Sequence, residues 1–403
     1  MLNSAEVVFL INVVFLLPSF LIGETSSELL RVAQGITIIY AIAFLPRIRT
    51  YHYVGRLCGL FALFTLLSVL SEFLHSTTDY LYIIRQVFHL LYFPCIFVVL
   101  SAVRKKMYFY GMFALLFLYV AELLIFLPKM NIDTSFLNGN LLENRLIKKA
   151  KYILLDEGYS LVSVHTIPLL FFSVIPFLSR AKRLLLSILL VFLLLFTFTF
   201  TVWAGVIAAF CIFLFASYKY DPLPRYFLSY VLLGGALLLS ALCVFYPFET
   251  FTLTTGRSLL WEHAFTAFRS HWLFGISMDD FYNNTYQAFM QSGLQAVTDF
   301  EEGTFDFTSG GCHNIYLNVA MNKGLLAFLV YLAFLSTLWK AIRASDRGPI
   351  WMMGFFYMVV RCFAESTGII ETSSGKLELI FDIYVLYLLT NNPYPSDRHN
   401  SEV

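Results

Sequence analysis

Charge is scarce in this chain. Only 13% of its 403 residues are Asp, Glu, Lys or Arg, whereas a soluble globular domain carries about 25%. The scarcity excludes a soluble enzyme, because 59% of the residues are apolar and most of their side chains would have nothing to pack against. It also excludes a disordered chain, which would be polar and charge-rich. The formal net charge of +1 gives no indication of nucleic acid as a partner.

Several motifs of soluble chemistry are missing too. There is no GxxxxGK[ST] loop, so the sequence is not that of an ABC exporter. The six cysteines show neither CxxC zinc spacing nor a disulfide framework, and we expect no metal and no cofactor. The first residues, MLNSAEVV, lack a positive n-region and a cleavage site, so Val7–Ile22 is predicted to be a retained first span.

What the chain has in abundance is apolar sequence long enough to cross a bilayer. A crossing helix needs about 20 mostly apolar residues. We find twelve such stretches and predict an all-α polytopic membrane protein. Their centres lie near residues 14, 37, 65, 94, 117, 168, 192, 209, 236, 326, 357 and 384. Leu184–Ala216 holds 33 uncharged residues, too many for one span, and we divide it at Thr199–Gly205.

Basic residues are concentrated in alternate short loops, which the positive-inside rule makes cytoplasmic. Together with Arg398 in the tail, these loops carry 15 of the 27 basic residues, so both termini are predicted to be inside. The clusters are Arg47/Arg49/Arg56, Arg104/Lys105/Lys106, Arg180/Lys182/Arg183, Lys219/Arg225 and Lys340/Arg343/Arg347.

The predicted organisation therefore has three parts. Residues 1–246 hold spans one to nine, with a smaller extracytoplasmic segment at 128–157. Residues 247–313 form a large extracytoplasmic loop. Residues 314–403 hold spans ten to twelve and a cytoplasmic tail.

The smaller extracytoplasmic segment, residues 128–157, is unexpectedly basic. Arg145, Lys148, Lys149 and Lys151 lie on the side that should be poor in positive charge. They either flank a helix and face water, or they meet an anion. Apolar residues recur on one helical face of this segment, so we predict an interfacial helix beside the active cavity.

The 67-residue loop is the only sizeable element outside the predicted spans, so any chemistry is expected there. The segment Thr254–Trp261 opens a helical pattern, and its apolar positions suit an amphipathic helix on the membrane surface. Gly275 then interrupts the pattern within Trp272–Ile276. The loop ends at Cys312, His313 and Asn314, immediately before the predicted span Ile315–Leu338.

Two segments of this loop carry a family resemblance. They are TTGRSLLWEHAFTAFRSHWLFGIS and, some forty residues later, HNIYLNVAMNKGLLAF. Together they resemble the signature of the bacterial O-antigen polymerase and O-antigen ligase superfamily: a GR..LW segment, a Gly-Ile turn, then HN.YL with a glycine eleven residues after the histidine. His313 and Gly324 have that spacing.

The resemblance implies a GT-C-like membrane glycosyltransferase at the periplasmic face of the bacterial inner membrane. Its donor would be an oligosaccharide on undecaprenyl diphosphate. In these roles Arg257 would stabilise the leaving diphosphate, because a guanidinium is always charged and binds phosphate oxygens in bidentate fashion. His313 would take the proton of the acceptor hydroxyl. The expected partners are this lipid-linked substrate, membrane lipid and a chain-length regulator protein.

Other residues are weaker candidates for substrate binding. His165 lies near the outer end of a span, where an ionisable group costs energy unless it faces a cavity, and it either lines the site or is structural. Arg361 and Glu365, one helical turn apart, form a structural ion pair or a second contact for diphosphate or sugar. Arg145, Lys148, Lys149 and Asn314 complete the predicted substrate-binding set.

Three functions remain open. A polymerase joins repeat units on the lipid diphosphate, a ligase moves the polymer to the lipid A core, and a transporter only moves the lipid-linked sugar. The large outer loop disfavours the transporter. In the resembling ligases the turn between the seventh and eighth spans carries an arginine, whereas Thr197–Ala204 has none. Trp261 and Ala327 also depart from the ligase pattern, so the sequence favours the polymerase.

Overall fold

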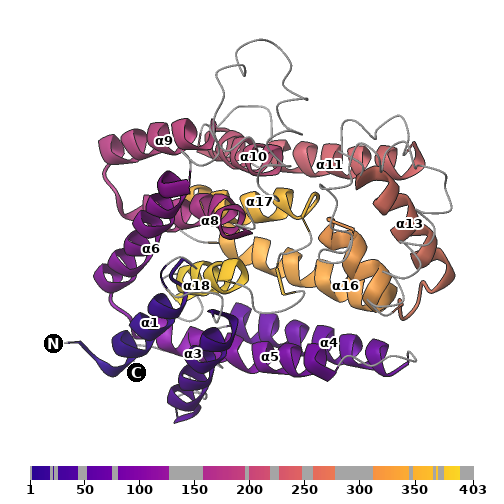
Figure 1. The fold of residues 1–403 in the computed structure, drawn as a ribbon, viewed down its shortest axis with the longest axis horizontal. Coiled ribbons are helices and arrows are strands. Elements are labelled where there is room, and N and C mark those ends of the chain that lie inside the picture. The colour runs from indigo at the N-terminus through magenta and orange to yellow at the C-terminus, as the bar shows by residue number, and fades with distance from the viewer. Residues whose placement is uncertain are drawn as a thin grey trace.

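The structure is a computed structural model that describes residues 2–18, 21, 26–43, 52–74, 80–126, 158–195, 199–217, 227–246, 257–276, 312–344, 348–365, 369–370 and 376–390. Every regular element within these ranges is a helix (Figure 1). The helices are α1 (Ser4–Phe15), α3 (Ser26–Ala41), α4 (His52–Phe73), α5 (Tyr80–Ser101), α6 (Lys105–Phe126), α8 (Gly158–Val174), the 3₁₀ helix η4 (Ile175–Phe177), α9 (Arg180–Leu195), α10 (Phe200–Ser217), α11 (Phe227–Phe245), α13 (Arg257–Ser270), α16 (Ile315–Arg343), α17 (Gly348–Arg361) and α18 (Lys376–Thr390).

Each of the twelve predicted span centres falls within one of these helices. Within the residues that the structure describes, four helical stretches are long and apolar enough to cross a membrane, namely Tyr53–Phe73, Ile83–Ser101, Lys105–Ile125 and Ile315–Arg343. The prediction of an α-helical polytopic membrane protein is therefore confirmed, while the count of twelve spans and the layout of the loops stay predictions.

Two predicted boundaries can be compared with the helices. Leu184–Ala216 is divided into two helices as predicted, but earlier in the chain, because α9 ends at Leu195 and α10 begins at Phe200. The first helix is shorter than predicted and ends at Phe15. Pro18 follows closely, and a proline disfavours helical backbone at the residue before it.

Helix α18 lies at the centre of the bundle (Figure 1). All of its residues from Lys376 to Leu389 are buried, and it contacts α4, α5, α8 and α16. It carries Asp382, whose Oδ2 lies 2.7 Å from Nε2 of His89 on α5. Ionisable groups inside a membrane bundle normally face its interior and pair there, and this pair follows that rule.

Four helix ends meet at one end of the bundle. Tyr108 near the start of α6 stacks on Tyr387 near the end of α18, with 3.5 Å between the ring centroids. Phe177 in η4 contacts both rings and also Trp351 near the start of α17. The basic turns that precede α6 and open α9 adjoin these ends. We call this the basic end.

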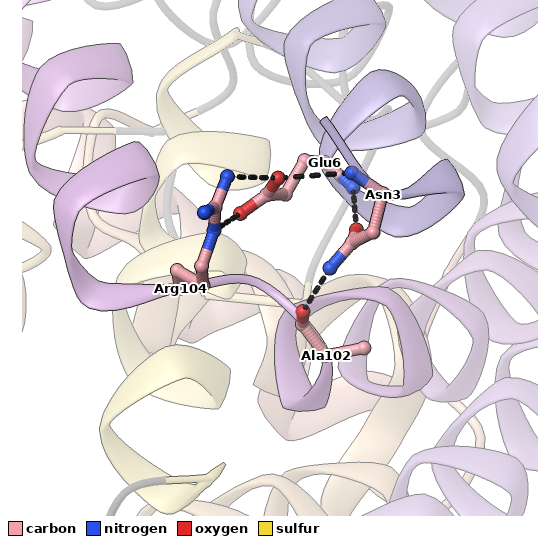
Figure 2. Close-up of polar contacts among 4 residues, drawn as sticks. All are labelled: Asn3, Glu6, Ala102 and Arg104. Carbon is pink, nitrogen blue, oxygen red and sulfur yellow. Dashed lines mark hydrogen bonds and ion pairs between the residues drawn. The ribbon is translucent and has the colours of Figure 1, made fainter. Parts of the chain in front are cut away.

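Hydrogen bonds join the beginning of α1 to the basic end (Figure 2). Arg104, in the turn before α6, donates from Nε and Nη2 to the carboxylate of Glu6, at 2.5 and 2.8 Å. The side-chain amide of Asn3 donates to the carbonyl of Ala102, 3.1 Å away. Asn3 and Glu6 also form a capping box that satisfies the first backbone N–H groups of α1. The N-terminal helix therefore starts at the basic end.

Helix α16 is interrupted at Gly324, whose backbone is not helical. The part before the interruption runs from the end of α17, where Ile315 N donates to Cys362 O at 3.0 Å, to the last turn of α4, where Lys323 meets Glu72. The part after it, residues 325–343, approaches the roughly 20 residues that cross a bilayer. The helix begins where the sequence predicted, and Ile315–Arg343 as a whole is long and apolar enough to cross a membrane.

Candidate functional site

Helix α13 packs along the first part of α16. Its apolar side chains Leu260, Trp261 and Ala264 are buried with Cys312 and Met321 in a small core of their own. The prediction that this face lies on the membrane surface is therefore wrong for these residues. Helical periodicity shows that a face is apolar, but it does not show whether lipid or protein covers that face.

Two glycines make close backbone contact where these elements end. Gly275 has a φ of 75° and Gly324 a φ of 78°, a region that side chains with a Cβ rarely adopt. A Cβ on Gly275 would lie 2.4 Å from Met321 O, and a Cβ on Gly324 would lie 2.1 Å from Leu273 O. Both glycines of the family signature are thus required by the same contact.

Backbone hydrogen bonds close this contact on both sides. Ile276 N donates to Met321 O and Leu325 N donates to Trp272 O, each at 2.8 Å. We call the contact between residues 272–276 and 321–325 the glycine junction.

The other ends of the two helices are joined as well. The indole Nε1 of Trp261 donates to Cys312 O at 2.8 Å, so the start of α13 lies beside the residues that precede α16. Arg257 is the first residue of α13, and His313 follows Cys312 with a positive φ of 49°. The junction at one end and the Trp261 bond at the other fix these two residues relative to each other.

Cationic and hydrogen-bonding side chains gather around one carboxylate. Arg257 Nη2 and His165 Nε2 each lie 3.7 Å from Oε1 of Glu365. Arg257 Nη1 also donates to the carbonyl of Ala364. Arg361 Nε donates to Nδ1 of His165 at 3.0 Å. Residues from α8, α13 and the end of α17 are thereby brought together at the end of α17 opposite the basic end.

The hydrogen bond from Arg361 determines the tautomer of His165. Because Nδ1 accepts a hydrogen bond from the guanidinium N–H of Arg361, a neutral imidazole must carry its own proton on Nε2. That N–H faces Glu365. The His165 backbone is held in turn by Tyr357, whose hydroxyl donates to His165 O at 2.6 Å.

Electrostatics keep Glu365 ionised. Burial raises the pKa of its carboxyl and is the largest single effect, but the neighbouring Arg257, His165 and Arg361 side chains lower it and together prevail. His313 adds a smaller lowering of this pKa. The resulting pKa of Glu365 is about 2.

Several predicted site residues therefore meet, and others do not. Arg257, His313, His165, Arg361 and Glu365 share one cluster. The expectation that Arg361 and Glu365 lie one turn apart on a helix is wrong, because α17 ends at Arg361.

Two further outcomes concern the rest of the predicted set. Asn314 is the N-cap of α16, and its Oδ1 accepts from the backbone N–H groups of Tyr316 and Leu317. Arg145, Lys148 and Lys149 lie outside the described residues. Sequence reasoning missed Tyr357 and the Ala364 carbonyl, which have no recognisable motif.

The side chains around Glu365 are guanidiniums and imidazoles. Among the residues placed in the structure, no group of three or more His, Cys, Asp or Glu side chains could hold a metal ion. The arrangement of two guanidiniums and two imidazoles around a carboxylate is one that a phosphate oxygen, also anionic, can enter.

The fold and site together define an α-helical polytopic membrane protein with a cationic cluster at one end of its bundle. Residues 185–332 match the model of the family described as O-antigen ligase. The match covers α13, the glycine junction and the first part of α16, and it confirms the resemblance to the O-antigen polymerase and ligase superfamily, whose members are membrane enzymes of the glycosyltransferase type. The chain matches none of the curated proteins with which it was compared.

Proposed function

We propose that this chain is an O-antigen polymerase, a metal-independent inverting glycosyltransferase that joins oligosaccharide repeat units carried on undecaprenyl diphosphate. The observation that carries the proposal is the cluster of Arg257, His165, Arg361 and His313 around Glu365. The family match, described as O-antigen ligase, supports the general class of reaction.

The guanidinium of Arg257 would stabilise the leaving group. When the bond between the anomeric carbon and the diphosphate oxygen breaks, the electron pair stays on that oxygen and the leaving group gains negative charge. Arg257 is partly buried, so its charge acts on the phosphate with less screening than at a free surface. In this mechanism the diphosphate replaces the Glu365 carboxylate as its partner.

His313 would act as the base for the acceptor hydroxyl. A sugar hydroxyl of the incoming unit attacks the anomeric carbon from the side opposite the diphosphate, and its proton passes to His313. One carbon–oxygen bond forms, one breaks, and the configuration inverts. The products are a longer lipid-linked glycan, free undecaprenyl diphosphate and one proton.

The orientation belongs to the same proposal. The basic end would face the cytoplasm, with both chain termini, and the cluster would face the periplasm across the bacterial inner membrane. Cys312 is not a suitable probe of this orientation, because its side chain is fully buried. Ser270 on α13 and Lys105, the first residue of α6, are exposed.

Labelling tests the orientation. In a cysteine-free background, Ser270→Cys should react with a membrane-impermeant thiol reagent in intact spheroplasts, and Lys105→Cys should react only after lysis. The reverse pattern would invert the orientation and remove the periplasmic reaction.

The missing arginine in Thr197–Ala204 favours the polymerase over the ligase. Deletion of the gene separates the two. A strain without the polymerase should make lipopolysaccharide with the core and one repeat unit but no ladder, because the ligase remains. Bare core with polymer left on undecaprenyl diphosphate would assign the chain as the ligase, and bare core without lipid-linked polymer would indicate a transporter.

A further inference from the structure

The glycine junction has a third side, formed by the last turns of α4. The hydroxyl of Ser71 lies 2.5 Å from Phe274 O and 2.9 Å from Asn322 O. One carbonyl belongs to each side of the junction, and Ser71 is more than 200 residues away in sequence from both. A single hydroxyl of α4 therefore bridges the two segments that the signature glycines bring together.

An ion pair lies directly beside this bridge. Lys323 Nζ is 2.6 Å from Glu72 Oε1, and each side chain is only 4% exposed. Lys323 precedes Gly324, and Glu72 follows Ser71. Breaking a buried pair by removing one partner leaves an uncompensated charge and is strongly destabilising, so the pair resists displacement of α16 from α4.

We infer that Ser71, Glu72 and Lys323 are positioning residues that hold α13 and α16 in the arrangement that brings Arg257 and His313 to the cluster around Glu365. The inference rests on the proposed function for the roles of those two residues. None of the three touches the cluster around Glu365 in the contacts described above; they act through the junction.

The length of α13 determines how far Arg257 would move if the helix tilted at the glycine junction. Helix α13 has 14 residues, so Arg257 lies about 20 Å from the end that enters the junction. A tilt of about 5° at the junction would therefore move Arg257 by nearly 2 Å. A displacement of about 1 Å can lower a rate about a hundredfold. A small change in the contact between α4 and the glycine junction would therefore lower the rate of the reaction.

Ser68 is a matched control for Ser71. Both are buried serines on α4, about one turn apart, and the Ser68 hydroxyl makes no hydrogen bond to any residue that the structure describes. In purified protein with lipid-linked repeat units, Ser71→Ala should lower kcat about tenfold or more and change KM less than about twofold. Ser68→Ala should keep both constants.

The ion pair is tested by reversal. Glu72→Lys and Lys323→Glu should each lower kcat strongly, and the double variant should recover much of it, because the pair is restored with exchanged ends. A purely structural contribution would instead lower the amount of folded protein and leave kcat per folded molecule unchanged.

A distance measurement keeps this inference separate from the proposed function. Spin labels at Thr266 on α13 and at Leu329, which follows Gly324 in α16, report the arrangement of the two helices in the full chain, and both positions are exposed. Ser71→Ala and Glu72→Lys should broaden the distance distribution, and Ser68→Ala should not. Unchanged distributions and unchanged kcat in Ser71→Ala would overturn the positioning role. If the wild-type protein makes no polymer, the proposed function fails, whereas the distance distributions still decide whether these residues position α13.

Discussion

Replacement of Gly324 by alanine should stop polymer formation. With φ of 78° and ψ of 177°, Gly324 lies in a backbone region that is essentially restricted to glycine and costs other residues about 1–3 kcal/mol. The added carbon would also lie 2.1 Å from Leu273 O, more than about 1 Å short of van der Waals contact. Because the neighbouring atoms are backbone, one side of the glycine junction must move by about that distance. A displacement of this size at the reacting groups lowers a rate about a hundredfold.

Gly234 in α11 provides the control, since a Cβ there meets nothing within 4 Å. Gly234→Ala should keep full activity, because alanine is also the better helix former by about 1 kcal/mol. The assay measures polymer per folded molecule in detergent, with thermal unfolding as the measure of folding. Wild-type activity in Gly324→Ala would refute the claim that the junction positions the site. Folded protein without polymer would support it.

Three further predictions concern individual charges. Arg257→Ala should abolish long-chain product and Arg257→Lys should keep little, because a point charge does not reproduce the bidentate contact. His313→Ala should lose turnover but still bind the lipid-linked donor. Full activity in all three variants would contradict the mechanism. Reversing Lys148 and Lys149 to Glu should raise KM for the lipid-linked substrate more than it lowers protein abundance, and a change in abundance alone would make that segment structural. Glu365→Gln should lower the unfolding temperature equally at about pH 5 and pH 8, because a carboxyl with a pKa of about 2 contributes its stability at every pH above its unfolded value and loses it only as the pH falls towards 2. A smaller difference in unfolding temperature between the wild type and Glu365→Gln at about pH 5 than at about pH 8 would contradict the low pKa of Glu365.

Much of the helical architecture could be predicted because a bilayer requires long apolar stretches. Arg257 and His313 could be named because both lie in local signatures at the two ends of one loop. Their proximity to Glu365 could not be predicted, since it depends on α8 and α17 packing together across almost 200 residues of sequence.

The missed residues had a weaker signal. Lys323 is a charge within the predicted span Ile315–Leu338, and an ionisable residue in a span usually has a function and a partner. The sequence did not reveal that the partner is Glu72 on α4. The apolar face of α13 was assigned to the membrane surface for a related reason, because periodicity does not identify what covers a face.

The most direct test of the account is polymerisation by the purified protein. The protein in detergent, given only repeat units linked to undecaprenyl diphosphate and excess EDTA, should produce a ladder of longer lipid-linked glycans and release undecaprenyl diphosphate, and Arg257→Ala should produce neither. A ladder that disappears with EDTA and returns with a divalent cation would contradict the metal-independent mechanism. A wild-type protein that makes no ladder, yet transfers preformed polymer to lipid A core, would contradict the polymerase assignment itself.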